Sequence, residues 1–198
     1  VILPTSTLIN NLSNRSNVST SSFIVGGGTL IIPADFWLWA SATGTAALIV
    51  DTQNATIENS GNIVGKGANQ GNAGGPAISI TASGVTIINN SDAYIAGGGG
   101  SGAQGRNGGP GFGAGGGAAG NGFSGAGGSG GSVGNNGTHY GNDGGGPLNG
   151  SGGGGGWGAR GGGNGLSGSV GTAGGKGIEA NGNSFTLTNN GTIYGAQS

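Results

Sequence analysis

The chain has 198 residues, 56 of them glycine, and charged residues amount to only 6%, with a formal net charge of −1. It contains no cysteine, which excludes disulfides and thiolate metal sites, and no apolar run of about 20 residues that would span a membrane. The five cations are scattered, which argues against a nucleic-acid binder because such proteins cluster their phosphate-neutralising charge.

The N-terminal part has the pattern of short strands. Residues 6–11 (STLINN) and 28–40 (GTLIIPADFWLWA) are rich in the apolar and β-branched residues that strands favour. Around Trp37 and Trp39 both faces are apolar, so this segment is expected to be buried on both sides, or on one side against another chain. We assign residues 1–46 to stem-side strands and an attachment segment.

A repeat follows in residues 47–65, 77–97 and 177–195. Each copy has a short alternating strand, a Thr–apolar pair, an asparagine and a closing glycine, and its asparagine cluster is typical of a tight turn. Because so small a unit cannot bury its apolar face alone, we expect two-stranded copies that stack into a β-solenoid-like base over residues 47–97 and 176–198. The aligned residues are Thr56, Thr86 and Thr186; Ile57, Ile87 and Leu187; and Asn59, Asn89 and Asn189.

Glycine-rich sequence interrupts this repeat at one point. The short link after residue 65 and the long link after residue 97 leave the repeat at the same place and return at the same place, so the ends of an insert at 98–175 should lie close together. Aromatic residues within the insert, and a length that is improbable for a structureless loop, favour order over a flexible tether. We predict polyglycine-II helices that bond laterally through their backbones, with a disordered insert as the alternative.

The predicted fold class is therefore all-β with irregular parts. It combines a short-stranded β-solenoid-like base with an inserted bundle of polyglycine-II helices. Side chains too large for a glycine lattice should be confined to its outside or its ends. The loops expected at the end far from the base are 103–107, 135–143 and 157–160.

Four segments set around the glycine-rich block resemble the receptor-binding tips of tailed-bacteriophage fibres: IENSGNIVGKG, GGPAISI, TIINNSDAYIAGGGGSG and TNNGTIYG. The resemblance covers residues 47–97 and 176–195 and extends to the tips of siphophage central fibres and the glycine-rich adhesins of T-even-like long tail fibres. It implies a polyglycine-II sandwich that presents variable loops to a bacterial outer-membrane protein. It implies no catalytic or metal motif and no cofactor.

Loops on a rigid scaffold are where binding residues concentrate, and interfaces are enriched in Trp, Tyr and Arg. We therefore expect the bulky and charged side chains of the insert to contact the receptor. Packing against the edge of the bundle is the alternative role for the aromatic ones. The candidate receptor-binding residues are Arg106, Asn107, Asn136, His139, Tyr140, Asp143, Leu148, Trp157, Arg160 and Leu166.

The expected partners are a bacterial outer-membrane porin or transporter, with lipopolysaccharide as the runner-up, and the rest of the tail fibre. The expected location is the distal tip of the fibre on the virion. The Trp37–Trp39 face and the lack of an initiator methionine lead us to expect a homotrimer that forms a C-terminal piece of the fibre, with a single-copy cap as the alternative.

Two other functions remain open on the sequence, although we predict no enzyme activity. A tailspike that binds or cleaves polysaccharide also stacks strands, and cleavage would need two nearby carboxylates, for which Glu58 and Asp92 on successive copies are the candidates. Both residues equally suit turns on a solvated edge. An ice-binding glycine-rich protein would need a flat face of regularly spaced threonines or small residues, and the separators in the insert are irregular.

Overall fold

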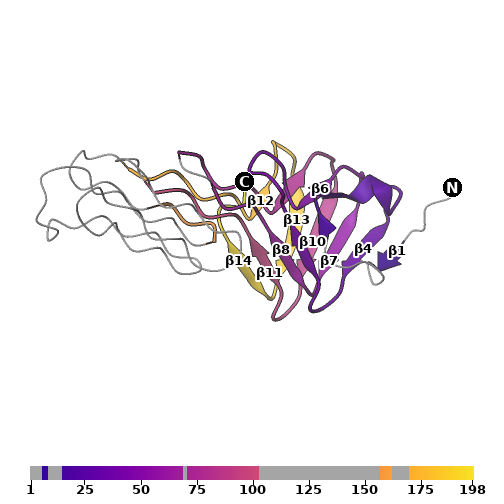
Figure 1. Cartoon of the computed structure of the whole chain (residues 1–198). Helices are drawn as coiled ribbons and strands as arrows, with labels where there is room; N and C mark the ends of the chain where they lie inside the picture. Colours follow the sequence, from indigo (N-terminus) through magenta and orange to yellow (C-terminus); the bar gives the residue numbers. More distant parts are fainter. Residues whose placement is uncertain (1–5, 9–14, 69–70, 103–156, 162–169) are drawn as a thin grey trace, which may run out of the picture.

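The computed structural model describes residues 6–8, 15–68, 71–102, 157–161 and 170–198, which wind into a β-solenoid with one 3-10 turn, η1 (Thr20–Ser22). In Figure 1 the N-terminal strands lie at one end of the solenoid, and the described margins of the insert leave from the other. No helix in this part of the chain is long and apolar enough to cross a membrane. The strands are β1 (Ser6–Leu8), β2 (Arg15–Ser16), β3 (Val18–Ser19), β4 (Thr29–Ile32), β5 (Trp37–Trp39), β6 (Leu48–Val50), β7 (Thr56–Asn59), β8 (Asn62–Val64), β9 (Ile78–Ile80), β10 (Val85–Asn89), β11 (Tyr94–Ala96), β12 (Ile178–Glu179), β13 (Phe185–Asn189) and β14 (Thr192–Tyr194).

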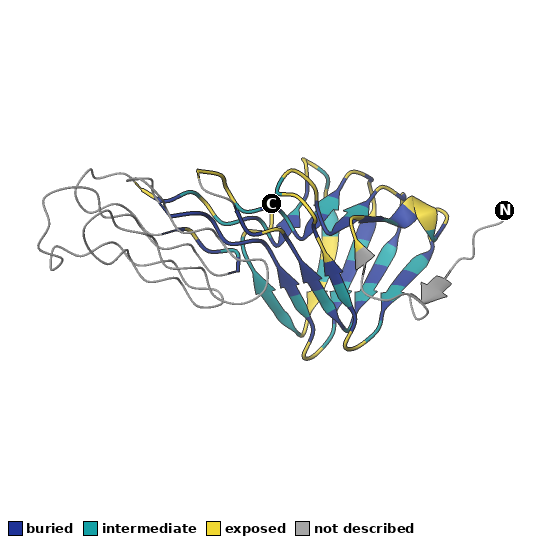
Figure 2. Ribbon diagram, viewed as in Figure 1, coloured by how far each residue is buried: buried dark blue, intermediate teal, exposed yellow. Residues whose placement is uncertain are grey.

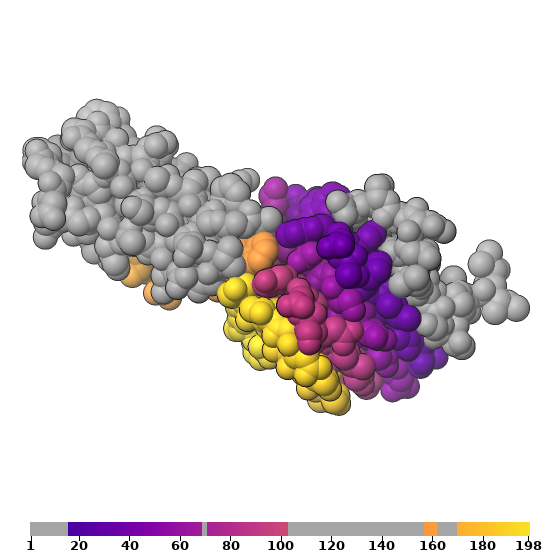
Figure 3. Space-filling view, turned by 90° about the horizontal axis from the view of Figure 1, so that it is seen from below, coloured from indigo at the N-terminus to yellow at the C-terminus, as the bar shows by residue number. Residues whose placement is uncertain are grey.

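The strands form three parallel sheets. Sheet A has the order β1-β4-β7-β10-β13, sheet B the order β14-β11-β8-β5-β2, and sheet C the order β12-β9-β6-β3. Each turn of the solenoid, called a coil below, contributes successive strands to the sheets, so that every coil hydrogen-bonds to the coils before and after it. Figure 3 shows these coils following one another from the indigo to the yellow end.

The repeat predicts the stacking but not the number of strands. Thr56, Thr86 and Thr186 lie opposite one another in sheet A, as the alignment of the copies requires. Each copy contains three strands rather than the expected two, because its first alternating stretch and its last apolar pair belong to different sheets. Residues 29–39 add the further coil expected of them, in register with β7 and β8.

Residues with positive φ recur at the corners of the coils. Asn54 (φ 54°) and Gly84 (φ 71°) occupy the same corner in successive coils, and Asp35 (φ 63°) and Asp92 (φ 64°) occupy another. Asn, Asp and Gly adopt this left-handed conformation at the lowest cost, which explains their presence between β-branched strands. Asp92 is therefore a turn residue at an exposed edge.

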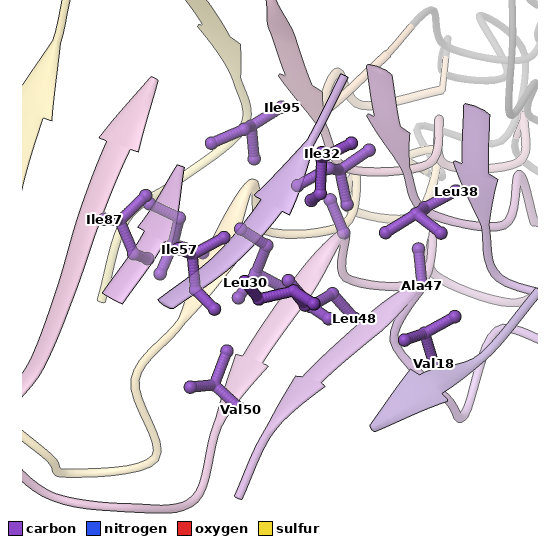
Figure 4. Packing of buried hydrophobic residues seen from close by; sticks show 14 of the residues in the cluster. Val18, Leu30, Ile32, Leu38, Ala47, Leu48, Val50, Ile57, Ile87 and Ile95 are labelled. Carbon is purple, nitrogen blue, oxygen red and sulfur yellow. The ribbon is translucent and has the colours of Figure 1, made fainter. Parts of the chain in front are cut away.

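Inward-facing side chains stack in rows along the solenoid and make one continuous apolar core. In strands β4, β7 and β10 every second residue is dark blue in Figure 2, because successive side chains point to opposite faces of a sheet. In Figure 4, Leu30, Ile57 and Ile87 form one such row, with Leu48 and Val50 of sheet C facing them. All five side chains are fully buried.

A ladder of asparagines replaces the apolar row at one corner of the core. Asn59 Nδ2 donates to Asn89 Oδ1 at 2.8 Å, and Asn89 Nδ2 donates to Asn189 Oδ1 at 2.8 Å. Asn59 Oδ1 also accepts from the backbone N–H of Gly61, which ties the ladder to the turn that follows. The repeated asparagine thus meets its own copies above and below, and buried amides are satisfied without water.

Asp51 fastens the turn η1 to the body of the solenoid. Its carboxylate accepts hydrogen bonds from the hydroxyls of Ser19, Thr20 and Ser21 at 2.6, 2.9 and 2.7 Å, and from the backbone N–H of Ser21 at 2.9 Å. Partial burial alone would raise the pKa of Asp51, but these hydrogen bonds favour the charged form and lower the pKa to about 2.

We expect Asp51→Asn to destabilise the protein at neutral pH. The folded pKa lies below the unfolded value of 3.8, so the stabilisation by Asp51 is fully present above about pH 4 and is lost as the pH falls toward about 2. Urea unfolding at about pH 7 and about pH 2 measures this difference, with Asp35→Asn as the control at an exposed turn that suits either residue. A gap between wild type and Asp51→Asn that is equally large at both pH values would contradict the role given to the carboxylate.

The connections between sheets B and C all lie at one corner, and they lengthen along the chain. The connection is residue 17 alone in the first coil, 40–47 in the second, 65–77 in the third and 97–177 in the fourth. The solenoid therefore gathers its glycine-rich connections at one place, as the sequence predicts for both links. This corner is where the described margins of the insert begin.

Candidate functional site

The described margins of the insert are extended segments held side by side by backbone hydrogen bonds. Gly98 N–H donates to the carbonyl of Gly75 at 2.9 Å, and Gly175 N–H donates to the carbonyl of Gly98 at 2.7 Å. Gly75 N–H in turn donates to the carbonyl of Lys66 at 2.8 Å. Segments from three separate parts of the sequence thus satisfy one another's backbone groups laterally, which offsets part of the entropy cost of ordering glycine.

The segments approach so closely that a side chain has no room. A Cβ added to Gly98 would lie 1.9 Å from the Lys66 carbonyl oxygen, and one added to Gly175 would lie 1.9 Å from that of Gly75. Real Cβ atoms essentially never come within 3.0 Å of another heavy atom. Contact between backbones therefore requires glycine at these positions of the described margins, and a glycine offers no side chain for recognition.

A group of hydroxyls joins the lattice where small polar residues replace glycine. Ser101 is fully buried, and its backbone N–H donates to Thr172 Oγ1 at 2.8 Å. Its own hydroxyl accepts from the backbone N–H of Gly71 at 2.9 Å, and Thr172 Oγ1 also donates to the carbonyl of Asn72. Three segments far apart in sequence meet at this point.

Trp157 lies against the outer face of sheet B, and not at the far end of the insert as the sequence predicts. Its side chain is only 7% exposed and covers Val64 and Ala96 on β8 and β11. The Trp157 side chain fills a hollow between outward-facing aromatic residues of three coils, so its position is that of a packing residue. Its ring centroid lies 5.8 Å from that of Tyr194, 6.0 Å from that of Tyr94 and 6.5 Å from that of Trp37.

The residue after it, Gly158, is wedged into the junction of insert and base. Its N–H donates to the carbonyl of Gly97 at 2.7 Å, at the point where the insert begins. Its φ of +61° is left-handed, and an added Cβ would lie 2.3 Å from the backbone nitrogen of Gly195. Only glycine fits here. In Figure 3 the orange atoms of the returning margin lie against the magenta and yellow strands.

Of the other predicted contact residues, Arg160 is the one that the structure describes. Arg160 is exposed and follows three residues after Trp157, on the margin next to the base rather than far from it. The partners that surround Trp157 were not predicted, although the repeat places Tyr94 and Tyr194 on the outer face of one sheet. The remaining candidates lie outside the described residues: Arg106, Asn107, Asn136, His139, Tyr140, Asp143, Leu148 and Leu166.

The structure also tests the expectation that the segment around Trp37 and Trp39 is buried on both sides, or on one side against another chain. Leu38 is fully buried in the core, and Trp37 on the opposite face is covered in part by Trp157 of the same chain. Trp39 remains 40% exposed. One of the two aromatic residues that led us to expect a homotrimer therefore has its contact within the chain.

Glu58 lies in strand β7 and Asp92 in the turn before β11. Glu58 Oε1 accepts from Asn90 Nδ2 at 3.5 Å, whereas Asp92 occupies its left-handed turn. Lys176 Nζ and Glu179 Oε1, three residues apart in the chain, form an ion pair at 3.4 Å. Within the described ranges there is no group of three or more His, Asp or Glu residues that could hold a metal ion.

Comparison with known proteins gives the family. Residues 4–198 match the family described as phage tail fibre adhesin Gp38. The crystal structure of the gp37–gp38 adhesin tip complex of the bacteriophage S16 long tail fiber matches 87% of this chain and 72% of that chain, with 22% sequence identity and a TM-score of 0.56. At this identity the match shows a shared fold. No curated protein matches significantly. The chain belongs to the Gp38 family of phage tail fibre adhesins, which places it on the tail fibre of the virion.

Proposed function

We propose that the protein binds a bacterial outer-membrane protein, a porin or a transporter, through side chains on the loops of its insert, without chemical turnover. One observation carries this proposal: at the described margins of the insert, glycines such as Gly98, Gly100, Gly161 and Gly175 lie so close to neighbouring backbones that a Cβ would not fit. Side chains able to recognise a receptor must therefore be displayed at the loops or the edges. We infer that residues 98–175 continue this lattice as packed polyglycine-II helices.

We propose that the opposite end of the solenoid faces the fibre. Strands β1 and β4 lie at the end of the solenoid away from the insert margins, consistent with the assignment of residues 1–46 to the stem side (Figure 1). The matched structure is a complex of gp37 with gp38, and we infer a comparable fibre partner here. Because Trp37 packs on Trp157 within one chain, we favour a single-copy cap over the homotrimer, and the mass of the assembled tip tests this point.

We propose that direct receptor contact falls to the other candidate residues of the insert, not to Trp157. The residues concerned are Arg106, Asn107, Asn136, His139, Tyr140, Asp143, Leu148, Arg160 and Leu166. Trp157 is omitted because a side chain 7% exposed against sheet B has little surface to offer a partner.

A competition experiment tests the proposed function. Purified protein should block adsorption of the parent phage and release no sugar from envelope polysaccharide. Tyr140→Ala should weaken competition near thirtyfold, because truncating a central aromatic anchor commonly costs about 2 kcal/mol of binding. Thr188→Ala, on the exposed face of β13, is the matched control. Polysaccharide cleavage that disappears in Glu58→Gln would replace the proposal with the tailspike function.

A further inference from the structure

Segments without side chains lack the usual means of fixing their register. In an ordinary sheet, the alternation of inward and outward side chains penalises a slip of one residue, whereas glycine-rich strands are prone to slippage. Along the lattice, a glycine segment moved along its axis meets the same N–H and C=O groups again. The distance from the solenoid at which the insert displays its loops must therefore be set by residues other than glycine.

We propose that Trp157 and the Ser101–Thr172 pair are positioning residues that fix the register of the glycine segments on the solenoid. This inference rests on the proposed function, because it concerns how the loops of the same site are placed. Within the described residues of the insert, Trp157 is the large side chain and Ser101 the polar side chain that are buried, and Thr172 is half-buried beside Ser101. They act at two levels, Trp157 at the sheet and the hydroxyl pair within the lattice.

Trp157 fixes the returning segment against sheet B. Its indole occupies a hollow bordered by Tyr94 and Tyr194, with ring centroids at 6.0 and 5.8 Å, and the next residue bonds to the carbonyl of Gly97. A slip of one residue would withdraw the indole and place a residue with a Cβ where only Gly158 fits. In the described part of the chain the indole Nε1–H has no hydrogen-bond partner, so shape rather than polarity holds the ring.

Ser101 and Thr172 fix the segments to one another. The Thr172 hydroxyl accepts from Ser101 N–H at 2.8 Å and donates to the carbonyl of Asn72, so it needs a donor on one side and an acceptor on the other. The backbones are joined as well, since Thr172 N–H donates to the Ser101 carbonyl at 2.9 Å. A displaced Thr172 would leave the buried N–H of Ser101 with only its long hydrogen bond of 3.4 Å to the Asn72 carbonyl, a costly arrangement.

Two matched pairs of variants test the proposal: Trp157→Ala with Trp157→Phe, and Thr172→Val with Thr172→Ser. Residue-resolved amide exchange reports on the lattice through Gly98, Gly158 and Gly175, and on the core through Ile87. Trp157→Ala and Thr172→Val should accelerate exchange at the lattice amides by about tenfold or more, while Ile87 is unchanged. Trp157→Phe and Thr172→Ser should restore most of the protection, since they keep the ring and the hydroxyl.

Two exchange results would overturn the proposal. Unchanged exchange at the lattice amides in Trp157→Ala and Thr172→Val would show that these side chains do not set the register. Equal acceleration at Ile87 would show that they hold the whole fold instead. Phage adsorption separates this inference from the proposed function: if wild-type protein fails to compete while the exchange pattern holds, the function is wrong and the register result stands.

Discussion

Gly98→Ala is expected to disrupt the margin of the insert and to destabilise the protein by about 3 kcal/mol or more. The added Cβ would lie 1.9 Å from the Lys66 carbonyl oxygen and 2.7 Å from the nitrogen of Gly67. Both are backbone atoms, which cannot rotate away as the end of a side chain could. Relief would require the segments to separate, with loss of the hydrogen bond from Gly98 to Gly75 and of that from Gly175 to Gly98.

Gly44→Ala is the control for this prediction. Gly44 is exposed, its φ is not left-handed, and no atom lies within 4 Å of its added Cβ. Alanine should be neutral there, or stabilising by a few tenths of a kcal/mol, because it restricts the unfolded chain. Thermal unfolding compares the two variants. Equal stability of Gly98→Ala and Gly44→Ala would mean that the backbones are less closely packed than the structure shows.

Asn89→Ala is expected to destabilise the base by about 2–4 kcal/mol. The change removes the middle of the asparagine ladder, so that Asn59 Nδ2 keeps only its 3.3 Å hydrogen bond to the Tyr94 carbonyl and Asn189 Oδ1 loses its bond from Asn89. Asn59 and Asn89 are fully buried, so water cannot replace the bond between them without opening the coil. Urea unfolding measures the loss.

Asn190→Ala supplies the comparison, because Asn190 is the next residue after the ladder and its side chain is exposed. Its effect should stay within about 0.5 kcal/mol, as is usual for surface substitutions. If Asn89→Ala were as mild as Asn190→Ala, the ladder would contribute little and the apolar rows alone would hold the coils in register.

The stacking of the coils could be predicted from the sequence because the repeated side chains determine which residues pair between coils. Thr56, Thr86 and Thr186 recur with the same neighbours, and the structure pairs them. Two strands were expected in each copy instead of three because some of the strands are very short; β12, for example, contains only Ile178 and Glu179. Two or three residues are too few for a periodicity to be distinguished from the end of a neighbouring strand.

The predicted position of Trp157, at the far end of the insert, was wrong for a different physical reason. In a glycine-rich stretch, a large side chain cannot enter the lattice, which correctly places Trp157 outside it. Whether the ring then faces solvent or the base depends on a hollow made by Trp37, Tyr94 and Tyr194, which come from three coils and meet only after folding. No pattern local to residue 157 contains that information.

Direct binding to outer-membrane vesicles tests the central claim of host recognition by the insert. Vesicles are prepared from a bacterium that the parent phage infects and from a phage-resistant mutant of it that lacks one outer-membrane protein. We predict saturable binding of the purified full chain to the first vesicles, at least about tenfold weaker binding to the second, and intermediate loss for Tyr140→Ala. Equal binding to both vesicles, or binding that Tyr140→Ala and the other loop variants leave unchanged, would contradict recognition of a protein receptor by these loops.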